Sequence, residues 1–129
     1  AIDGARKLWE LLGARTIQMS PEAHDAALAA TSHVPHLVAS ALAGVTPVDV
    51  LPLAAGGWHD TTRIAASDAA LWSQILLDNR DCVSAVLTKV EENLTAFRRA
   101  IESGDLPEIE RLWNLGRNRR EAAERARRK

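Results

Sequence analysis

One long helix with a single apolar face constrains the fold of this chain more than any other feature of its sequence. Between residues 83 and 101, six apolar side chains recur at alternating spacings of four and three: Val83, Leu87, Val90, Leu94, Phe97 and Ile101. This spacing places all six on one side of an α-helix. The seam is shorter than three heptads, which favours a bundle helix over a free coiled coil. Long helix faces of this kind are often buried against a second copy of the chain.

The remainder of the sequence after residue 20 also reads as helical. Ser20 suits a helix cap and Pro21 suits the first turn of the helix that follows. Pro35 lacks a backbone N–H and clashes one turn back, so we expect a kink or a restart near His33. We expect a short helix at residues 47–54. Further helix boundaries are expected at Gly44, at Gly56 and Gly57, near Asp78 and Asn79, and at Gly104, with Asp105 as the cap of the last helix.

The first twenty residues have a different pattern. Residues 4–12 are amphipathic, and Gly13 suits the left-handed position that closes a helix. Residues 14–20 alternate Ile17 and Met19 with polar side chains, which predicts a strand. A strand needs a ladder partner, so this helix–strand unit is typical of the end of an α/β domain. Because the sequence enters this unit directly at Ala1, we expect a piece of a longer protein.

Composition and charge exclude several classes of protein. Apolar residues make up 47% of the 129, which indicates one globular domain rather than a disordered chain. No uninterrupted apolar run approaches the roughly 20 residues of a membrane span, so no membrane partner is expected. The single cysteine, Cys82, forms no internal disulfide and is interpreted as a small core residue. These features are compatible with a reducing, cytoplasmic setting.

The C-terminal residues 117–129 carry seven basic and two acidic side chains, although the net charge of the chain is −1. A basic tail raises the alternative of a helical interaction module that binds nucleic acid. The tail has no aromatic residue on which a base could stack. A solvated terminal helix is therefore the preferred interpretation, and nucleic acid is considered an unlikely partner.

Three polar side chains, Ser32, His33 and His36, interrupt the apolar stretch around Pro35. The two histidines could share a metal, with His24 as a third ligand, but no HExxH pattern supports such a site. Ser32 and His33 resemble a catalytic pair only in composition, because adjacent helix residues point about 100° apart. We therefore favour neither a metal site nor a nucleophilic site, and no metal is expected.

The segment from Gly56 to Arg63 is better suited to binding an anion. Gly56 and Gly57 lack the GxGxxG spacing and do not follow a strand, so a dinucleotide site is not expected. Arg63 lies three residues after Asp60, and a guanidinium oriented by a carboxylate matches a carboxylate of a ligand. A plain surface pair of Asp60 and Arg63 is the alternative.

Three motifs in order give the chain a resemblance to a known family. They are TSHVPH at residues 31–36, GGWHDTTRIAASD at 56–68, and LW at 71–72. Together they resemble the C-terminal helical domain of prephenate and arogenate dehydrogenases, and the likeness runs from about residue 1 to 104. The resemblance implies an all-α helical bundle over residues 21–129 that forms an interlocked homodimer. Residues 1–20 would then be a helix–strand remnant of an α/β dinucleotide-binding domain.

The resemblance also implies an activity. Enzymes of this family oxidise prephenate or arogenate with NAD or NADP and release carbon dioxide, in tyrosine biosynthesis in the cytoplasm. The nucleotide-binding glycines and the catalytic histidine belong to the preceding domain. We therefore expect no catalytic residue and no cofactor-binding residue within this sequence, and expect the isolated chain to be inactive.

In the family the helical domain completes the substrate pocket, and the resemblance assigns residues to it. Ser32 and His36 match the serine and last histidine of the family's SHxPH motif, which face the substrate. Arg63 matches the arginine that binds a substrate carboxylate. The imidazole of His33 is interpreted as a structural hydrogen-bonding group.

Further residues follow from the same likeness. Asp60 and Gly56 match residues that position the loop of the arginine. Trp72 matches a tryptophan that approaches the pocket, and the resemblance leaves open whether the partner subunit supplies it. One position departs from the family pattern: His59 follows Trp58 where a more strongly basic residue is usual, which leaves the choice between prephenate and arogenate open.

Overall fold

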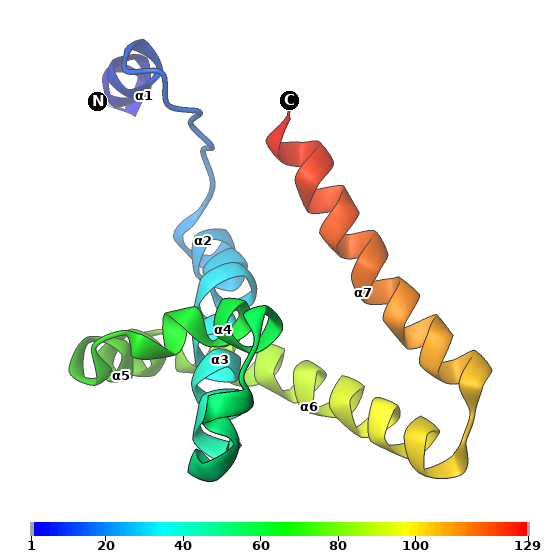
Figure 1. Cartoon of the computed structure of the whole chain (residues 1–129). Helices are drawn as coiled ribbons and strands as arrows, with labels where there is room; N and C mark the ends of the chain where they lie inside the picture. The colour runs from blue at the N-terminus through cyan, green and yellow to red at the C-terminus, as the bar shows by residue number, and fades with distance from the viewer. Residues whose placement is uncertain (1, 129) are drawn as a thin grey trace. The chain divides into compact units, whose positions relative to one another are not determined.

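The computed structural model describes residues 2–128, and the chain divides into two compact units, residues 1–82 and 83–129. Every regular element among the described residues is helical, which confirms the all-α prediction (Figure 1). The predicted boundary at residue 20 is a different division of the chain, and it stays a prediction.

The N-terminal helix α1, Ile2–Leu11, has no buried residue. Gly13 follows it with φ of +80°, a conformation that glycine adopts without steric cost. Residues 14–20 then form an extended connector to the next helix, and the predicted strand is wrong (Figure 1). The alternation of Ile17 and Met19 is present, but no second strand exists among residues 2–128 to complete a ladder.

A continuous helical stretch follows, and it consists of α2 (Pro21–Leu28), a π-helical turn η1 (Ala29–His33) and α3 (Val34–Val45). Ser20 caps its start, since the Ala23 N–H donates to the Ser20 hydroxyl at 3.2 Å. The disturbance expected from Pro35 occurs where it was predicted, as a widened turn rather than a break. The Val34 N–H bonds to the carbonyl of Ala29, five residues back, and this wider turn accommodates the proline ring.

This stretch, Pro21–Val45, is long and apolar enough to cross a membrane by length and composition alone. The count of uninterrupted apolar residues overlooked it, because His24, Asp25 and His33 interrupt the run. Only 22% of its most apolar window is buried in the single chain. Its residues Asp25 and His33 contact Asn79, and His33 and His36 contact Trp72, as described below.

Short helices return the chain against α3. They are η2 (Val48–Leu53), α4 (Gly56–Thr62), η3 (Arg63–Ala66) and α5 (Ala69–Asp78). The predicted boundary at Gly44 is wrong, because Gly44 lies within α3, which ends at Val45. A boundary does occur at the Gly56–Gly57 pair, which begins α4. Helix α5 is capped by Asp68, which accepts from the Leu71 N–H at 2.8 Å.

The packing of the first unit is centred on α3. Both α4 and η3 lie against α3. The buried side chains in this region are small, namely Ala29, Val34 and Ala39, together with Thr62. Small side chains allow helices to approach closely, and this brings the site residues of α3, η3 and α5 together.

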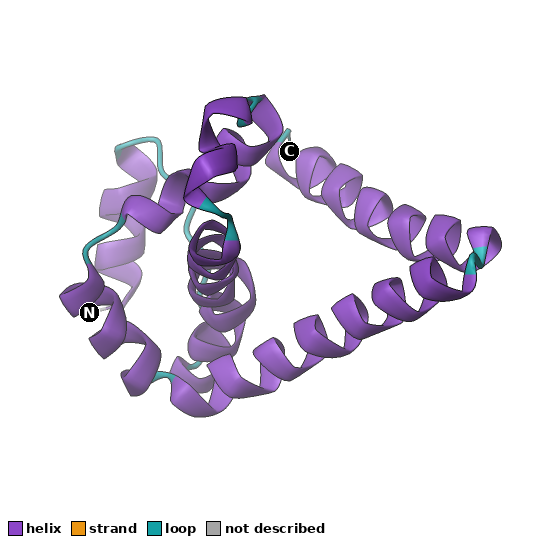
Figure 2. Cartoon of the chain, turned by 60° about the horizontal axis from the view of Figure 1, so that its bottom comes forward, coloured by secondary structure: helices purple, strands orange, loops and turns teal. Residues whose placement is uncertain are grey.

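The second unit contains the C-terminal part of α6 (Arg80–Ser103) and α7 (Leu106–Arg127). Gly104, with φ of +68°, ends α6, and Asp105 caps α7 by accepting from the Glu108 N–H at 3.1 Å. Figure 2 shows two long helices that diverge from this single turn. Both predicted boundary residues, Gly104 and Asp105, are confirmed.

The apolar seam of α6 is only partly covered within the single chain. Val83, its first member, is buried, and Phe97 is half-buried. Leu94 and Ile101 are 59% and 64% exposed, and Trp113 of α7 is 69% exposed. Cys82 is a free, half-buried thiol. The second unit therefore presents apolar side chains that its own helices do not cover.

The basic C-terminal part of α7 is balanced by glutamates of the same helix. Arg117 and Arg125 both lie near Glu121, and Arg120 and Arg127 both contact Glu124. These pairs are three or four residues apart, the spacing at which helix side chains meet. The described basic side chains of residues 117–128 are largely occupied by acidic neighbours, which favours the solvated-helix interpretation over nucleic-acid binding.

The left-handed conformation of Gly104 predicts opposite effects of alanine at two glycines of the second unit. Gly104→Ala should lower the free energy of unfolding by roughly 1–2 kcal/mol, the cost of a Cβ in this conformation. Gly116→Ala lies inside α7 with no atom within 4 Å of an added Cβ, so it should raise stability by about 0.5–1 kcal/mol. Urea denaturation of both variants measures the difference, and equal changes would contradict the assigned turn.

A pH dependence follows from the first turn of α7. Arg111 donates two hydrogen bonds to the Glu108 carboxylate, at 2.6 and 2.7 Å, and they hold the pKa of Glu108 below its ordinary value. A lowered folded-state pKa contributes stability above the unfolded-state pKa, and the contribution is lost as pH falls through the folded-state value. Arg111→Ala should therefore destabilise the chain at neutral pH but not in strong acid. Denaturation at several pH values tests this, and a pH-independent difference would contradict it.

Candidate ligand-binding site

A cavity of about 420 Å³ lies within the first unit, between α3, η3 and α5. Its wall is mostly apolar, with a few polar groups, as is typical of small-molecule sites. The lining side chains used in the argument below are His36 and Ser40 from α3, Ile64 and Ala65 from η3, and Trp72 and Ser73 from α5.

Two of the predicted site residues form one wall of this cavity. The rings of His36 and Trp72 are stacked, with centroids 3.6 Å apart and planes inclined by 19°. The His36 Nδ1–H donates to the backbone carbonyl of Ser32 at 2.9 Å. A carbonyl only accepts, so the proton is on Nδ1 and the Nε2 atom is left for another partner. His36 therefore presents a flat face to Trp72 and a polar atom to a ligand.

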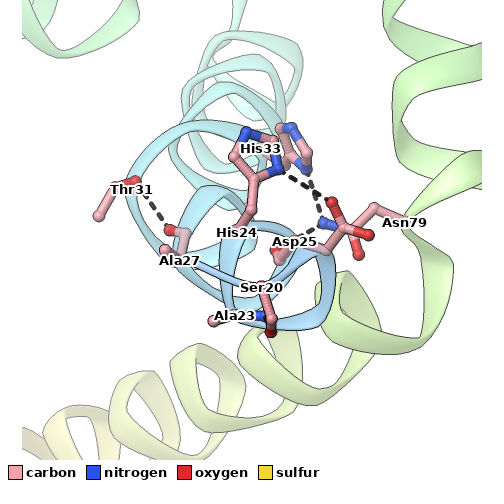
Figure 3. A network of polar contacts seen from close by, with 8 residues as sticks. All are labelled: Ser20, Ala23, His24, Asp25, Ala27, Thr31, His33 and Asn79. Carbon is pink, nitrogen blue, oxygen red and sulfur yellow. Dashed lines mark hydrogen bonds and ion pairs between the residues drawn. The ribbon is translucent and has the colours of Figure 1, made fainter. Parts of the chain in front are cut away.

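His33 is held away from the cavity by other residues. The Asn79 side-chain nitrogen donates to His33 Nδ1 at 3.2 Å and to the carbonyl of Asp25 at 2.7 Å (Figure 3). The edge of the His33 ring contacts Trp72, with centroids 6.2 Å apart and planes at 77°. These contacts support the interpretation of His33 as a structural hydrogen-bonding group.

Arg63 begins η3, directly before the lining residue Ile64, and its side chain is exposed. The predicted ion pair between Asp60 and Arg63 does not form, and among residues 2–128 Arg63 makes no hydrogen bond or ion pair. Thr62, with φ of −96° and ψ of 0°, separates the α-helix of Asp60 from the 3₁₀-helix of Arg63. The helical spacing that would bring the two side chains together is therefore lost, and the guanidinium can meet a ligand.

The remaining predicted site residues, Ser32, Gly56 and Asp60, do not line the cavity. Ser32 is half-buried in the π turn and contributes its carbonyl, rather than its hydroxyl, to the contact with His36. Gly56 and Asp60 are exposed on α4 and do not line the cavity. The sequence interpretation overlooked Ser40 and Ser73. Ser40 lies one helical turn after His36, and this spacing could have indicated that the two side chains share a face of the helix.

The histidines do not gather into a metal site in the described part of the chain. Within residues 2–128 no group of three or more His, Cys, Asp or Glu side chains is close enough to hold a metal ion. Instead, His24 pairs with Asp25 at 3.1 Å, His33 with Asn79, and His36 with the Ser32 carbonyl. Each of these three imidazoles therefore has its own polar partner.

Trp58 anchors α4 to the end of α3. Its indole N–H donates to the Thr46 hydroxyl at 3.1 Å, and that hydroxyl donates in turn to the carbonyl of Leu42 at 2.8 Å. At the other end of α4, the buried Thr62 hydroxyl donates to the Trp58 carbonyl at 2.8 Å. The aromatic side chain at this position thus fixes the short helix that leads to Arg63.

Comparison with known proteins places this geometry in context. The sequence matches the family described as "Prephenate dehydrogenase, dimerization domain" over residues 20–115. Cyclohexadienyl dehydrogenase of Zymomonas mobilis is 38% identical over 104 residues, which cover 75% of this chain and 36% of that protein. Prephenate dehydrogenase of Bacillus subtilis is 32% identical over 127 residues, which cover 94% and 34%. The chain thus spans about a third of the length of these curated relatives.

Solved structures agree with the sequence matches. Arogenate dehydrogenase of Synechocystis superposes with a TM-score of 0.81 at 26% identity, covering 95% of this chain and 47% of that one. Prephenate dehydrogenase of Aquifex aeolicus, in complex with hydroxyphenyl propionate and NAD⁺, gives a TM-score of 0.78 at 31% identity, covering 94% and 45%. Bacterial enzymes of aromatic biosynthesis are therefore similar to this chain in both sequence and fold.

The Trp58–Thr46 contact gives a testable coupling. Trp58→Phe and Thr46→Val should each lower stability by about 0.5–1.5 kcal/mol, because each removes the hydrogen bond between α4 and α3. The double variant should lose less than the two single losses combined, since the shared bond is counted only once. Trp113→Phe combined with Thr46→Val is the control and should be additive. Additivity in the Trp58 pair would contradict the anchoring role.

Proposed function

This chain belongs to the family of prephenate dehydrogenase dimerization domains, and from that premise we propose that it completes the substrate pocket and forms the homodimer of a prephenate or arogenate dehydrogenase. The proposed reaction is an NAD(P)-dependent oxidative decarboxylation in tyrosine biosynthesis, carried out in the cytoplasm. The complex of the Aquifex aeolicus enzyme with hydroxyphenyl propionate and NAD⁺ supports this choice of substrate class and cofactor.

The cavity wall formed by His36 and Trp72 is the observation that carries the proposal, together with Arg63, which directly precedes the lining residue Ile64 and makes no hydrogen bond or ion pair among residues 2–128. Prephenate and arogenate each combine a six-membered ring with carboxylate groups. The stacked pair offers a flat surface for the ring, and the guanidinium offers a fork that matches a carboxylate. The His36 Nε2 atom, left open by the bond to Ser32, is placed to bind a polar group of the substrate.

The other predicted residues have supporting roles in this proposal. Ser32 orients His36 through its carbonyl, and Asp60 and Gly56 shape the segment that leads to Arg63. Trp72 reaches the cavity from its own chain, where it stacks on His36. Among residues 2–128 there is no strand followed by a glycine-rich turn and a helix, so these residues do not fit a nicotinamide dinucleotide. In the complete enzyme a bound nicotinamide cofactor would supply the hydride acceptor, whereas the residues of this chain would bind and orient the substrate.

The uncovered apolar residues support the homodimer. Leu94, Ile101 and Trp113 are more than half exposed in the single chain, although they lie on long amphipathic helices. Apolar area of this kind is stabilised when a second copy removes it from water, at roughly 25 cal/mol per Å². A symmetric pair would bring the same faces of two copies together.

Loss of the dimer should follow from a charge on the seam. Leu94→Glu should convert the dimer into a monomer, because a carboxylate at this position would be buried without a partner. Lys89→Glu, at an exposed polar position of the same helix, is the matched control and should stay dimeric. Sedimentation velocity distinguishes the two species, and a dimeric Leu94→Glu variant would contradict the assigned face.

The substrate role of Arg63 is tested in the complete enzyme. Arg63→Ala should raise the KM for prephenate by about 30-fold or more, which corresponds to about 2 kcal/mol for the loss of one partner of a charged pair. Arg98→Ala, which removes a surface pair with Glu102 on α6, should leave the kinetics unchanged. Steady-state kinetics of both variants provide the measurement. Unchanged kinetics of Arg63→Ala would remove the proposed role.

A further inference from the structure

Asn79 joins two parts of the first unit that are distant in sequence. It lies between α5 and α6, and its side-chain nitrogen contacts the Asp25 carbonyl, 54 residues away, and His33 Nδ1, 46 residues away (Figure 3). Its backbone N–H bonds to the Ile75 carbonyl and closes α5. Neither the family match nor the motifs in the sequence assign a role to this asparagine.

The contacts of Asn79 fix the protonation of the His33 ring. The Asp25 carbonyl can only accept, so the amide nitrogen, rather than the amide oxygen, must face it. The second hydrogen of that nitrogen points to His33 Nδ1 at 3.2 Å. Nδ1 therefore accepts, and the neutral His33 ring carries its proton on Nε2. His36 has the opposite tautomer, because its Nδ1–H donates to the Ser32 carbonyl.

The two imidazoles hold Trp72 between them. The edge of His33 lies 6.2 Å from the indole at 77°, and the face of His36 lies 3.6 Å from it at 19°. Asn79 orients the ring of His33, and the Ser32 carbonyl orients the ring of His36. His36 and Trp72 line the cavity, His33 contacts Trp72 without lining it, and one hydrogen bond orients each of the two imidazoles.

We propose that Asn79 is a positioning residue for ligand binding, which acts by holding His33 in its Nε2-protonated form and thereby Trp72 and His36 in their stacked arrangement. Only a short side chain with two hydrogens on one nitrogen serves both acceptors. Aspartate would face two acceptors with oxygen atoms, and alanine would leave both acceptors without a donor. The proposal rests on the proposed function, since the ligand of this cavity is taken to be a carboxylate-bearing ring compound.

Nitrogen-15 NMR of the histidine rings in the full chain tests the first step without any ligand. In the wild type, His33 should show a proton on Nε2 and a lone pair on Nδ1, whereas His36 should show the reverse. Asn79→Asp should transfer the His33 proton to Nδ1, because the new carboxylate accepts from it. Asn79→Ala should leave a mixture of tautomers and shift the indole N–H signal of Trp72. Asn118→Ala, at an exposed position of α7, should change none of these signals.

The second step is measured in the complete enzyme. Asn79→Ala should raise the KM for prephenate and the Kd for hydroxyphenyl propionate by about five- to tenfold, the scale of one lost hydrogen bond, with kcat changed less than twofold. A wild-type His33 protonated on Nδ1, or variants with unchanged ring signals, would overturn the proposal. Altered ring signals with unchanged KM and Kd would also overturn it. Failure of the wild type to bind either compound would instead count against the proposed function, while the ring signals would still decide the role of Asn79.

Discussion

The site depends on how the helix over residues 21–45 accommodates Pro35. Proline removes a donor and crowds the preceding turn, and the chain responds with the π turn of residues 29–33. In this stretch the Ser32 carbonyl accepts from the imidazole of His36, while His33 faces Asn79. His33 and His36, three residues apart, therefore hydrogen-bond to different groups, although both rings contact Trp72.

The two units of the chain differ in how much of their apolar surface is covered by other residues of the same unit. The first unit packs η3 and α4 on α3 through small residues, and this close packing leaves a cavity beside His36. The second unit leaves Leu94 and Trp113 exposed, because its two helices diverge from the turn at Gly104 (Figure 2). The chain therefore contains a cavity within its first unit and long helix faces that its second unit leaves uncovered.

Arg63 differs from the arginines of α7 in its ion pairs. Arg117, Arg120 and Arg125 have glutamates one turn away, and exposed pairs of this kind contribute only a few tenths of a kcal/mol each to helix stability. Arg63 has no such partner among the described residues. The change from α- to 3₁₀-helix at Thr62 separates it from Asp60. Arg63 directly precedes Ile64, which lines the cavity, and in the proposed function its guanidinium binds a carboxylate of the ligand.

The sequence by itself determined the features that depend on neighbours within about four residues. It located the cap at Ser20, the stop at Gly104, the disturbance at Pro35 and the apolar seam of α6. The family motifs singled out His36 and Trp72, whose rings stack in the wall of one cavity. The tertiary structure decided the contacts that the spacing of residues along the chain does not determine. Residues 14–20 alternate like a strand yet have no ladder partner, and Asp60 and Arg63 are separated by a change of helix type. Asn79 meets His33 and Asp25 only because the fold closes loops of 46 and 54 residues. Local hydrogen bonds follow from the order of residues, whereas contacts across such distances exist only when the helices between them pack.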